Sequence, residues 1–354
     1  AQAILLLQLD RSGAWACGAM CESIRPDGQE CSCFGDQYFR QLRQRDGVPD
    51  EFVNGHLSFR PGGGKGGDLM AFVDDTYIVK ELSLADHAVL AEVTESYLQH
   101  VTTGHTLLTP IYLHYRVLAT GRCFFVMRNM IGSEPFDTVY DLKGCADDKM
   151  LINRGEAVPT RHKRIWKIWM WFGECAWSQD RHKYYDGKLR ARKAQVQLID
   201  RQRSQVVVAL RRDAEWLAAR HLMDYSLLIA IRERQPEAKQ PGGTGRQPLL
   251  RRKADGSEVA VYIAIIDFLQ KWSAKKEVAK AIKCMESDKA TVPPEAYSRR
   301  FCRCMEERFI PVHFEPEALV KKRSPSEHEQ LRRVVMVIAL LQFITAAMMV
   351  WTVP

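Results

Sequence analysis

Residues 223–228 read Met-Asp-Tyr-Ser-Leu-Leu, and the interpretation of the whole chain depends on this stretch. It follows an amphipathic helix expected over residues 205–221 and opens an apolar run. Asp224 therefore stands among apolar neighbours, where a lone carboxylate is costly to bury and needs a partner or a function. A helix cap or a structural hydrogen bond is the alternative interpretation.

A second carboxylate downstream has a comparable position. Asp267 ends a strand expected over residues 259–266, which is rich in β-branched side chains. A carboxylate at the carboxyl end of a buried strand is well placed to hold a metal ion such as magnesium. Here too, a cap or a structural hydrogen bond is the alternative.

Upstream of both carboxylates, a glycine-rich turn precedes a lysine. Residues 61–67 (PGGGKGG) contain the pattern G-x-G-x-x-G at Gly62, Gly64 and Gly67. No Ser or Thr follows Gly-Lys, which argues against a P-loop, and the strand that follows argues against a Rossmann fingerprint. A strand, glycines, a second strand and then a lysine is the order of a kinase glycine loop, with Lys80 as the lysine. A flexible linker followed by a surface lysine is the alternative.

Lys80, Asp224 and Asp267 are together the parts that phosphoryl transfer requires. A cation holds the phosphates, one carboxylate accepts the proton of the attacking hydroxyl, and a second carboxylate holds magnesium. The protein then contributes mainly positioning and charge neutralisation.

Two motifs resemble the phosphatidylinositol phosphate kinase family with high specificity. Residues 223–228 are identical to its MDYSLL signature, and residues 140–145 (YDLKGC) resemble its DLKGS motif. Further similarities follow the family's order along about residues 57–310. They are residues 77–80 (YIVK) to FIIK, 126–129 (VMRN) to VVMNN, 264–270 (AIIDFLQ) to GIIDxLQ, 275–277 (KKE) to KKxE and 291–301 (TVPPEAYSRRF) to VxPxxYxxRF.

This resemblance implies an α+β, two-lobed lipid-kinase fold, with ATP in a cleft between a sheet-rich N-lobe and a mixed C-lobe. ATP and Mg²⁺ are the implied cofactors. The implied catalytic residues are Lys80, Lys143 and Asp224, and the implied metal ligand is Asp267. The implied ATP-binding residues are Gly62, Gly64, Gly67, Lys80, Met127, Asn129, Met130 and Asp267. The residues implied to bind the anionic lipid headgroup are Lys275, Lys276, Lys289, Arg299 and Arg300.

The implied reaction is phosphorylation of the inositol ring of a phosphatidylinositol monophosphate. Phosphatidylinositol 4-phosphate, accepting at its 5-hydroxyl, is the expected substrate because that is the commonest member type; the 5-phosphate or 3-phosphate lipid is the alternative. Four residues depart from the family pattern, and they keep a catalytically weak or dead phosphoinositide-binding scaffold as an alternative of another class. They are Asp86 for Glu, Arg128 for Asn, Cys145 for Ser and Ala264 for Gly.

The composition of the 354 residues is that of a globular protein. With 46% apolar and 27% charged residues, it excludes a wholly disordered, collagen-like or coiled-coil chain. We expect an irregular N-terminal segment, a kinase domain with two variable insertions, a basic linker and an apolar C-terminal helix. Their expected ranges are 1–50, 51–315 with insertions at about 150–204 and 233–257, 316–333 and 334–354.

The net charge of +8 is concentrated in residues 161–203, which carry 12 Lys or Arg against 4 Asp or Glu. Within this segment, residues 161–177 (RHKRIWKIWMWFGECAW) interleave basic side chains with tryptophans. That combination suits docking on an anionic membrane surface. A helix whose tryptophans pack in the core is the alternative. The sequence shows no nucleic-acid-binding module, so no nucleic-acid partner is expected.

Residues 334–354 carry no charge over 21 positions. As a helix they would span about 30 Å, which is the thickness of one bilayer core. Arg332 and Arg333 stand directly before them, so that the bulk of the chain is expected in the cytosol. We therefore expect a membrane-associated protein with a possible transmembrane anchor, and a buried core helix is the alternative.

Overall fold

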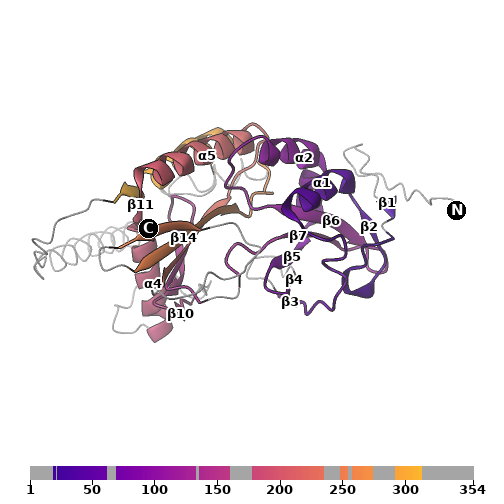
Figure 1. Ribbon diagram of the computed structural model, residues 1–354, viewed down its shortest axis with the longest axis horizontal. Helices are drawn as coiled ribbons and strands as arrows, with labels where there is room; N and C mark the ends of the chain where they lie inside the picture. Colours follow the sequence, from indigo (N-terminus) through magenta and orange to yellow (C-terminus); the bar gives the residue numbers. More distant parts are fainter. Residues whose placement is uncertain are drawn as a thin grey trace, which may run out of the picture. The chain divides into compact units, whose positions relative to one another are not determined.

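The computed structural model describes residues 19–20, 22–61, 69–132, 135–159, 178–234, 248–253, 257–273 and 292–312. All of them belong to one compact unit, which contains two antiparallel sheets and several helices (Figure 1). The mixed α+β class expected from the sequence is confirmed. A cleft between two lobes and an apolar C-terminal helix stay predictions.

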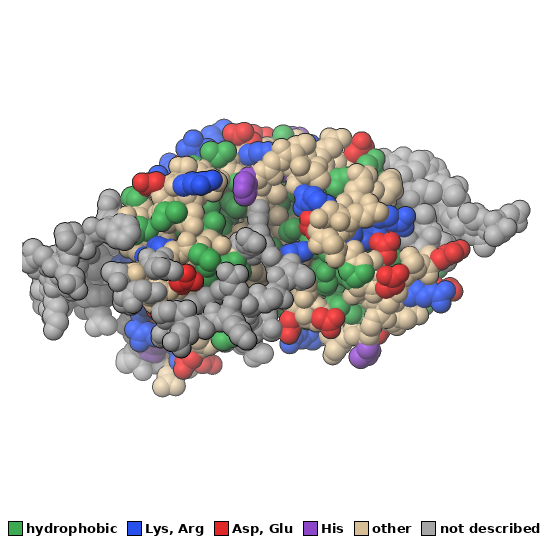
Figure 2. Space-filling view, in the orientation of Figure 1, with side chains coloured by type: hydrophobic (Ala, Val, Ile, Leu, Met, Phe, Trp, Pro, Cys, Tyr) green, Lys and Arg blue, Asp and Glu red, His purple; other side chains and the backbone are tan. Residues whose placement is uncertain are grey.

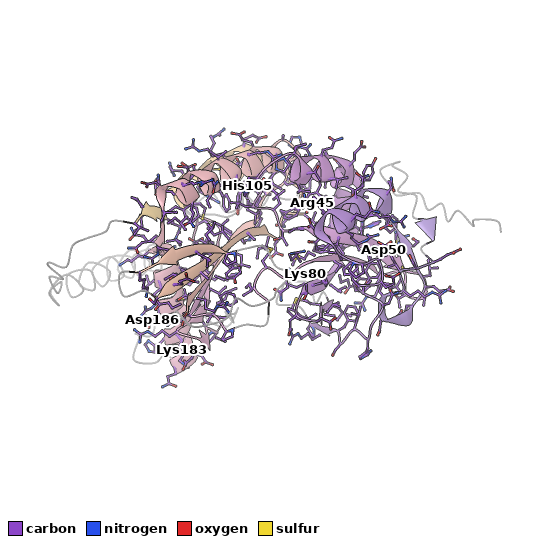
Figure 3. The ribbon with its side chains drawn as sticks, in the orientation of Figure 1. Arg45, Asp50, Lys80, His105, Lys183 and Asp186 are labelled. Carbon is purple, nitrogen blue, oxygen red and sulfur yellow. The ribbon has the colours of Figure 1, made fainter. Side chains whose placement is uncertain are left out.

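The first sheet holds seven strands in the order β1-β2-β6-β7-β5-β4-β3. Its best-buried strand is β7, of which every residue is buried. Strand β5 lies between β7 and β4 and carries Lys80 (Figure 3). The strands are β1 (Ala19–Met20), β2 (Cys31–Cys33), β3 (Arg60–Pro61), β4 (Leu69–Val73), β5 (Tyr77–Leu82), β6 (Ile111–Val117) and β7 (Cys123–Arg128).

Part of the N-terminal segment that was expected to be irregular is ordered, which corrects that prediction. It contains the short 3-10 helix η1 (Pro26–Gly28), strand β2 and helix α1 (Asp36–Asp46). Arg43 of α1 is completely buried, and its guanidinium donates to Asp36 Oδ1 at 2.8 Å, to Asp50 Oδ1 at 2.7 Å and to the Tyr112 carbonyl at 2.8 Å. Helix α1 packs Phe39 and Leu42 into the main core, and the buried arginine network also fixes it to β6.

The second sheet holds six strands in the order β10-β9-β8-β12-β14-β13. Strands β12 and β14 pair over nine positions, from Ser226 opposite Ile266 to Arg234 opposite Glu258. Because the pairing is antiparallel, the start of β12 lies beside the end of β14. The strands are β8 (Thr138–Leu142), β9 (Lys149–Asn153), β10 (Glu156–Ala157), β12 (Ser226–Arg234), β13 (Leu249–Arg252) and β14 (Glu258–Ile266).

The segment 233–257, expected as a variable insertion and composed like a polar loop, contains strand residues in its described part. Strand β12 continues to Arg234, and β13 pairs with β14 from Leu249 opposite Val261 to Arg252 opposite Glu258. Backbone pairing at the edge of a sheet thus overrides the loop-like composition of the segment.

Besides α1, four further α-helices of the described residues accompany the sheets, together with a small parallel pair of strands. Helix α2 (Leu84–Thr102) follows β5, and α4 (Gln179–Arg192), α5 (Asp200–Ala218) and α7 (Pro294–Glu306) accompany the second half of the chain. Strands β11 (Val196–Leu198) and β15 (Phe309–Pro311) pair in parallel. The outer side of α5 carries charged side chains with some hydrophobic ones among them (Figure 2), whereas Val206, Leu210 and Leu217 of the same helix are buried.

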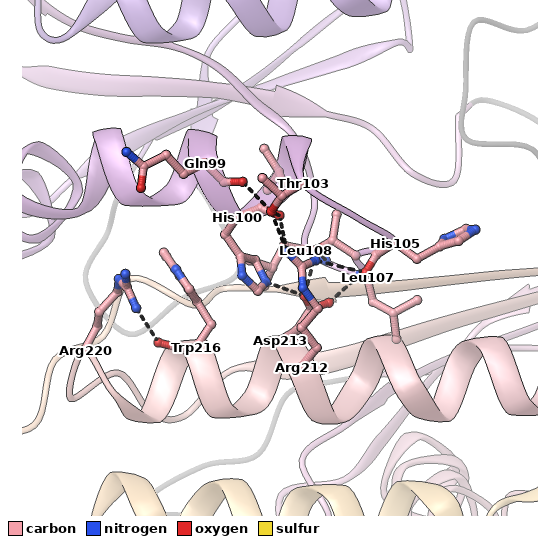
Figure 4. A network of polar contacts seen from close by, with 12 residues as sticks. Gln99, His100, Thr103, His105, Leu107, Leu108, Arg212, Asp213, Trp216 and Arg220 are labelled. Atoms are coloured by element: carbon pink, nitrogen blue, oxygen red, sulfur yellow. Dashed lines mark hydrogen bonds and ion pairs between the residues drawn. The ribbon is translucent and has the colours of Figure 1, made fainter.

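The segment between α2 and β6 is fastened to α5 by a buried polar network (Figure 4). Asp213 of α5 is completely buried; its Oδ1 lies 2.7 Å from His100 Nε2 and accepts from Thr106 Oγ1 at 2.8 Å. Its Oδ2 accepts from the Leu107 N–H at 2.5 Å. Beside it, Thr109 N–H donates to the Ile265 carbonyl at 3.0 Å, which connects this segment to β14.

No helix among the described residues is long and apolar enough to cross a membrane. Residues 334–354 lie outside that part of the chain, as do the tryptophan-rich residues 161–177.

A buried histidine pair under α2 predicts a stability that depends on pH. His87 Nδ1 of α2 lies 2.8 Å from His114 Nε2 of β6, and His114 is completely buried. Burial, followed by His87 and Arg116, holds the pKa of His114 well below its usual value. Folding therefore disfavours the protonated imidazole, and stability is lost as the pH falls below about 6.5, by up to about 1.4 kcal/mol per pH unit.

Urea unfolding between pH 7.5 and 5.5 measures this effect. The His114→Gln variant should lose this part of the pH dependence, whereas a variant of the exposed His105, His105→Gln, should keep it. An unchanged dependence in His114→Gln would show that another group is responsible.

Candidate active site

Lys80 and Asp267 form an ion pair although 187 positions separate them in the sequence. Lys80 Nζ lies 2.8 Å from Asp267 Oδ1, and the two side chains are 26% and 54% exposed. Lys80 comes from β5 of the first sheet, and Asp267 follows the last residue of β14 in the second. The sequence-predicted phosphate cation and metal ligand are therefore in contact, at a place open to solvent.

Lys143 and Asp224 form a second ion pair. Lys143 Nζ donates to Asp224 Oδ1 at 2.6 Å, and both side chains are largely covered, at 15% and 27% exposure. Lys143 directly follows β8, and Asp224 lies two residues before β12, which pairs with β8 from Leu227 opposite Leu142. The sheet thus places the turn after β8 next to the start of β12.

A third pair in this region was not predicted from the sequence. Lys149 Nζ of β9 donates to Asp141 Oδ2 of β8 at 3.2 Å. The two residues lie directly opposite each other in the β8–β9 pairing. A glycine turn between two strand-like segments is the signal that could have found it, because cross-strand neighbours of opposite charge attract.

The three lysines lower the proton affinity of Asp267. Desolvation alone would raise the pKa of this carboxyl, but the Lys80 ammonium, with Lys143 and Lys149 further away, brings it below its usual value. Asp267 is therefore ionised at neutral pH. A carboxylate that lies close to several lysine ammonium groups is suited to a ligand that carries both a metal cation and phosphate groups.

Asp224 and Asp267 share an uncommon backbone conformation. Their φ angles are +66° and +56°, in the left-handed region that non-glycine residues rarely adopt. Such residues each cost about 1–3 kcal/mol and gather at functional sites. We take this shared conformation, together with the two ion pairs, as support for a functional site.

The turn that carries Lys143 needs a glycine at position 144. Gly144 has a φ of +70°, and a Cβ atom there would lie 2.9 Å from Cys304 Cβ of α7. The next residue, Cys145, is buried, and burial raises the pKa of its thiol to about 11. Cys145 is therefore a neutral packing residue in this turn.

Replacing Gly144 by alanine should therefore destabilise the protein through two effects. A left-handed alanine costs about 1–2 kcal/mol, and the contact with Cys304 adds about 1–3 kcal/mol of overpacking. Gly155 is the matched control: its φ is +80°, and nothing lies within 4 Å of the position that a Cβ would occupy, so Gly155→Ala shows the backbone cost alone. Equal unfolding free energies of the two variants would contradict the close packing of the turn on α7.

The residues after β7 connect the two sheets and are mostly buried. Met127 belongs to the main core, whereas Met130 packs with Phe136 and Leu228 in a smaller cluster. Asn129 donates from its amide to the Asp75 carbonyl at 2.8 Å, and its backbone N–H donates to the Thr76 carbonyl at 2.7 Å. These contacts fix the segment to the turn between β4 and β5. Met127, Asn129 and Met130 stay predicted ATP-binding residues.

Arg128 of β7 is buried and takes part in a chain of hydrogen bonds. Its Nε donates to Tyr112 Oη at 2.8 Å, and the Tyr112 hydroxyl donates to Asp46 of α1 at 2.8 Å. Arg128, which replaces the family's asparagine, thus connects β7 to Tyr112 of β6 and, through Tyr112, to α1.

Several expected site residues lie outside the described part of the chain, namely Gly62, Gly64, Gly67, Lys275, Lys276 and Lys289. The remaining two headgroup candidates are on α7. Arg299 is exposed, and Arg300 is half-buried, with its guanidinium 5.2 Å from the centre of the Tyr297 ring. Tyr297 in turn donates to the Tyr225 carbonyl, directly after Asp224. Asp86 lies at the start of α2, where its backbone N–H donates to Ser83 Oγ at 3.2 Å.

The donor set fits a magnesium ion better than a metal held by protein groups alone. No cluster of three or more His, Cys, Asp or Glu side chains suited to a metal occurs in the part of the chain described here. Mg²⁺ is commonly held by one or two carboxylates together with substrate phosphates and water. The exposed carboxylate of Asp267, beside three lysines that attract phosphates, fits that arrangement.

A family profile and individual relatives both relate the chain to phosphatidylinositol phosphate kinases. A family profile described as phosphatidylinositol-4-phosphate 5-kinase matches residues 54–254 and 244–308. The chain is 25% identical to human phosphatidylinositol 5-phosphate 4-kinase type-2 gamma, over 75% of its own length and 73% of the relative's. It is 26% identical to the type-2 alpha protein of Sus scrofa, over 74% of each chain.

Proposed function

Because the chain belongs to the phosphatidylinositol phosphate kinase family, we propose that it transfers the γ-phosphate of ATP to the 5-hydroxyl of phosphatidylinositol 4-phosphate. The product would be phosphatidylinositol 4,5-bisphosphate. The observation that carries the proposal is the pair of contacts Lys80–Asp267 and Lys143–Asp224, which four separate sequence segments contribute. Membership of a kinase family implies the use of ATP.

The geometry supports a distinct role for each residue. Lys80 is the more exposed of the two lysines and would bind phosphate oxygens of ATP, after exchanging its contact with Asp267 for them. Asp224 would accept the proton of the inositol hydroxyl as that oxygen attacks the γ-phosphorus. Lys143, 2.6 Å from Asp224, would stabilise the negative charge on the transferring group.

Asp267 would hold magnesium. When bound, the ion would neutralise charge on the ATP phosphates and fix their orientation. Because the pKa of Asp267 is already low, its carboxylate needs no deprotonation to bind a cation.

The phosphatidylinositol 5-phosphate lipid is the second candidate substrate. The curated relatives named above are 5-phosphate 4-kinases, although an identity of 25–26% does not transfer a substrate preference. Arg299 and Arg300, with Lys275, Lys276 and Lys289, remain the proposed headgroup-binding residues. We propose that residues 161–177 and 334–354 hold the protein at the membrane surface where this lipid lies.

The experiment that tests the substrate uses liposomes. The full chain is incubated with magnesium, γ-labelled ATP and liposomes that contain the 3-, 4- or 5-phosphate lipid, and the position of the new phosphate is determined after deacylation. Labelled 4,5-bisphosphate formed from the 4-phosphate lipid alone is the expected result. Selective labelling of the 5-phosphate lipid would show that this lipid, and not the 4-phosphate lipid, is the substrate. Binding of all three lipids without phosphate transfer would favour a phosphoinositide-binding scaffold without kinase activity.

A further inference from the structure

The turn that carries Lys143 is organised around a buried carboxylate outside the residues assigned so far. Asp148 is 1% exposed, and its Oδ1 accepts from three successive backbone N–H groups. These are the N–H groups of Lys143 at 2.6 Å, Gly144 at 2.8 Å and Cys145 at 3.4 Å. Successive N–H groups that converge in this way form an anion-binding concavity. Here the anion is a side chain of the same turn.

The second oxygen of Asp148 is held from another part of the fold. Arg308, in the segment between α7 and β15, donates from Nη2 to Asp148 Oδ2 at 2.5 Å. Its Nη1 donates to the Ala191 carbonyl near the end of α4. The carboxylate therefore connects the turn to the α7–β15 junction and, through Arg308, to α4.

Two further contacts hold the same turn in place. Lys188 of α4 donates from Nζ to the Ala146 carbonyl at 2.6 Å. Gly144 lies so close to Cys304 of α7 that no side chain fits between them. The backbone of the turn is thus fixed on several sides, while the Lys143 side chain extends from it to Asp224 at 2.6 Å.

We infer that Asp148, held by Arg308, is a positioning residue for phosphoryl transfer that sets where Lys143 meets Asp224. This inference rests on the proposed function. Lysine has a long flexible stem, so the position of its ammonium depends on how firmly its backbone is held. A displacement of about 1 Å at a reacting group can lower a rate about 100-fold.

The test removes both buried charges together, because removing one would leave the other unpaired. The double variant Asp148→Asn with Arg308→Met keeps a carbonyl oxygen for the three N–H groups. The double variant Asp148→Ala with Arg308→Met does not. We expect the first to retain kcat within about threefold of the wild type. In the second we expect kcat and kcat/KM to fall together by about 10- to 100-fold, as for an interaction made in the transition state.

A second readout does not depend on activity. Lys143 is 15% exposed and paired, so an amine-reactive acylating reagent should label it slowly in the wild type and in the asparagine variant. Labelling in the alanine variant should be several-fold faster. Lys253, paired with Glu233 at 2.8 Å, is the internal reference and should not change. Equal kcat and equal Lys143 labelling in the two double variants would overturn the inference.

If the alanine variant does not fold, amide hydrogen exchange of the wild type tests whether Asp148 holds the turn. The N–H groups of residues 143–145 should exchange at least 100-fold more slowly than those of an open loop, and unprotected exchange would overturn the inference. A wild type that phosphorylates no lipid contradicts the proposed function, and the labelling and exchange results then still support or overturn the anchoring of Lys143 by Asp148.

Discussion

Replacing Asp224 by asparagine is expected to lower kcat by about 10²- to 10⁴-fold, the range that loss of a general base causes. The amide cannot accept the proton of the inositol hydroxyl, yet it has the shape of the carboxylate and tolerates the left-handed φ of +66°. The protein should therefore stay folded and bind ATP with little change. Initial rates of lipid phosphorylation, measured beside nucleotide affinity, check both parts.

Asp74 provides the matched control for this variant. It also has a positive φ, of +44°, but it lies exposed in the turn between β4 and β5. Asp74→Asn should keep the wild-type rate. A loss of activity in Asp224→Asn that is no larger than in Asp74→Asn would remove Asp224 from the chemistry.

Replacing Asp213 by alanine is expected to destabilise the fold by about 3–5 kcal/mol. The substitution leaves His100 Nε2, Thr106 Oγ1 and the Leu107 N–H without their acceptor (Figure 4). Each buried polar group without a partner costs about 1–3 kcal/mol. Because a domain has a total stability of about 5–15 kcal/mol, the variant should unfold at a much lower urea concentration.

Glu215, exposed on the same helix α5, is the control for this prediction. Glu215→Ala should change the unfolding free energy by less than about 0.5 kcal/mol. An effect below about 1 kcal/mol in Asp213→Ala would show that the network does not hold the segment between α2 and β6.

The sequence predicted the ends of strands well where apolar runs were long. Asp267 was placed at the end of a buried strand, and Asp224 before an apolar run that forms β12 in the structure. The β12–β14 pairing brings those two places together. Helix α1 was not predicted, because its short apolar face, Phe39 and Leu42, stands among polar residues and a buried arginine adds to its packing. Strand β13 was missed because its stability comes from pairing with β14.

The site could be predicted in its residue types but not in its contacts. Lys80 meets Asp267 across two sheets, and no local pattern encodes a contact between positions so far apart. Asp148 resembles an ordinary turn aspartate in the sequence. Its partner in the interior is Arg308, 160 positions later. Spacing along one chain cannot show which acidic residue of a turn faces inward.

The most direct test of the account is transfer of labelled phosphate from ATP to phosphatidylinositol monophosphates by the full chain and by four single variants. These are Lys80→Met, Lys143→Met, Asp224→Asn and Asp267→Asn. The account predicts phosphorylated lipid with the wild type and at least a tenfold lower rate with each folded variant. A wild-type rate retained by Asp224→Asn or Asp267→Asn would contradict the claim that these side chains form one phosphoryl-transfer site.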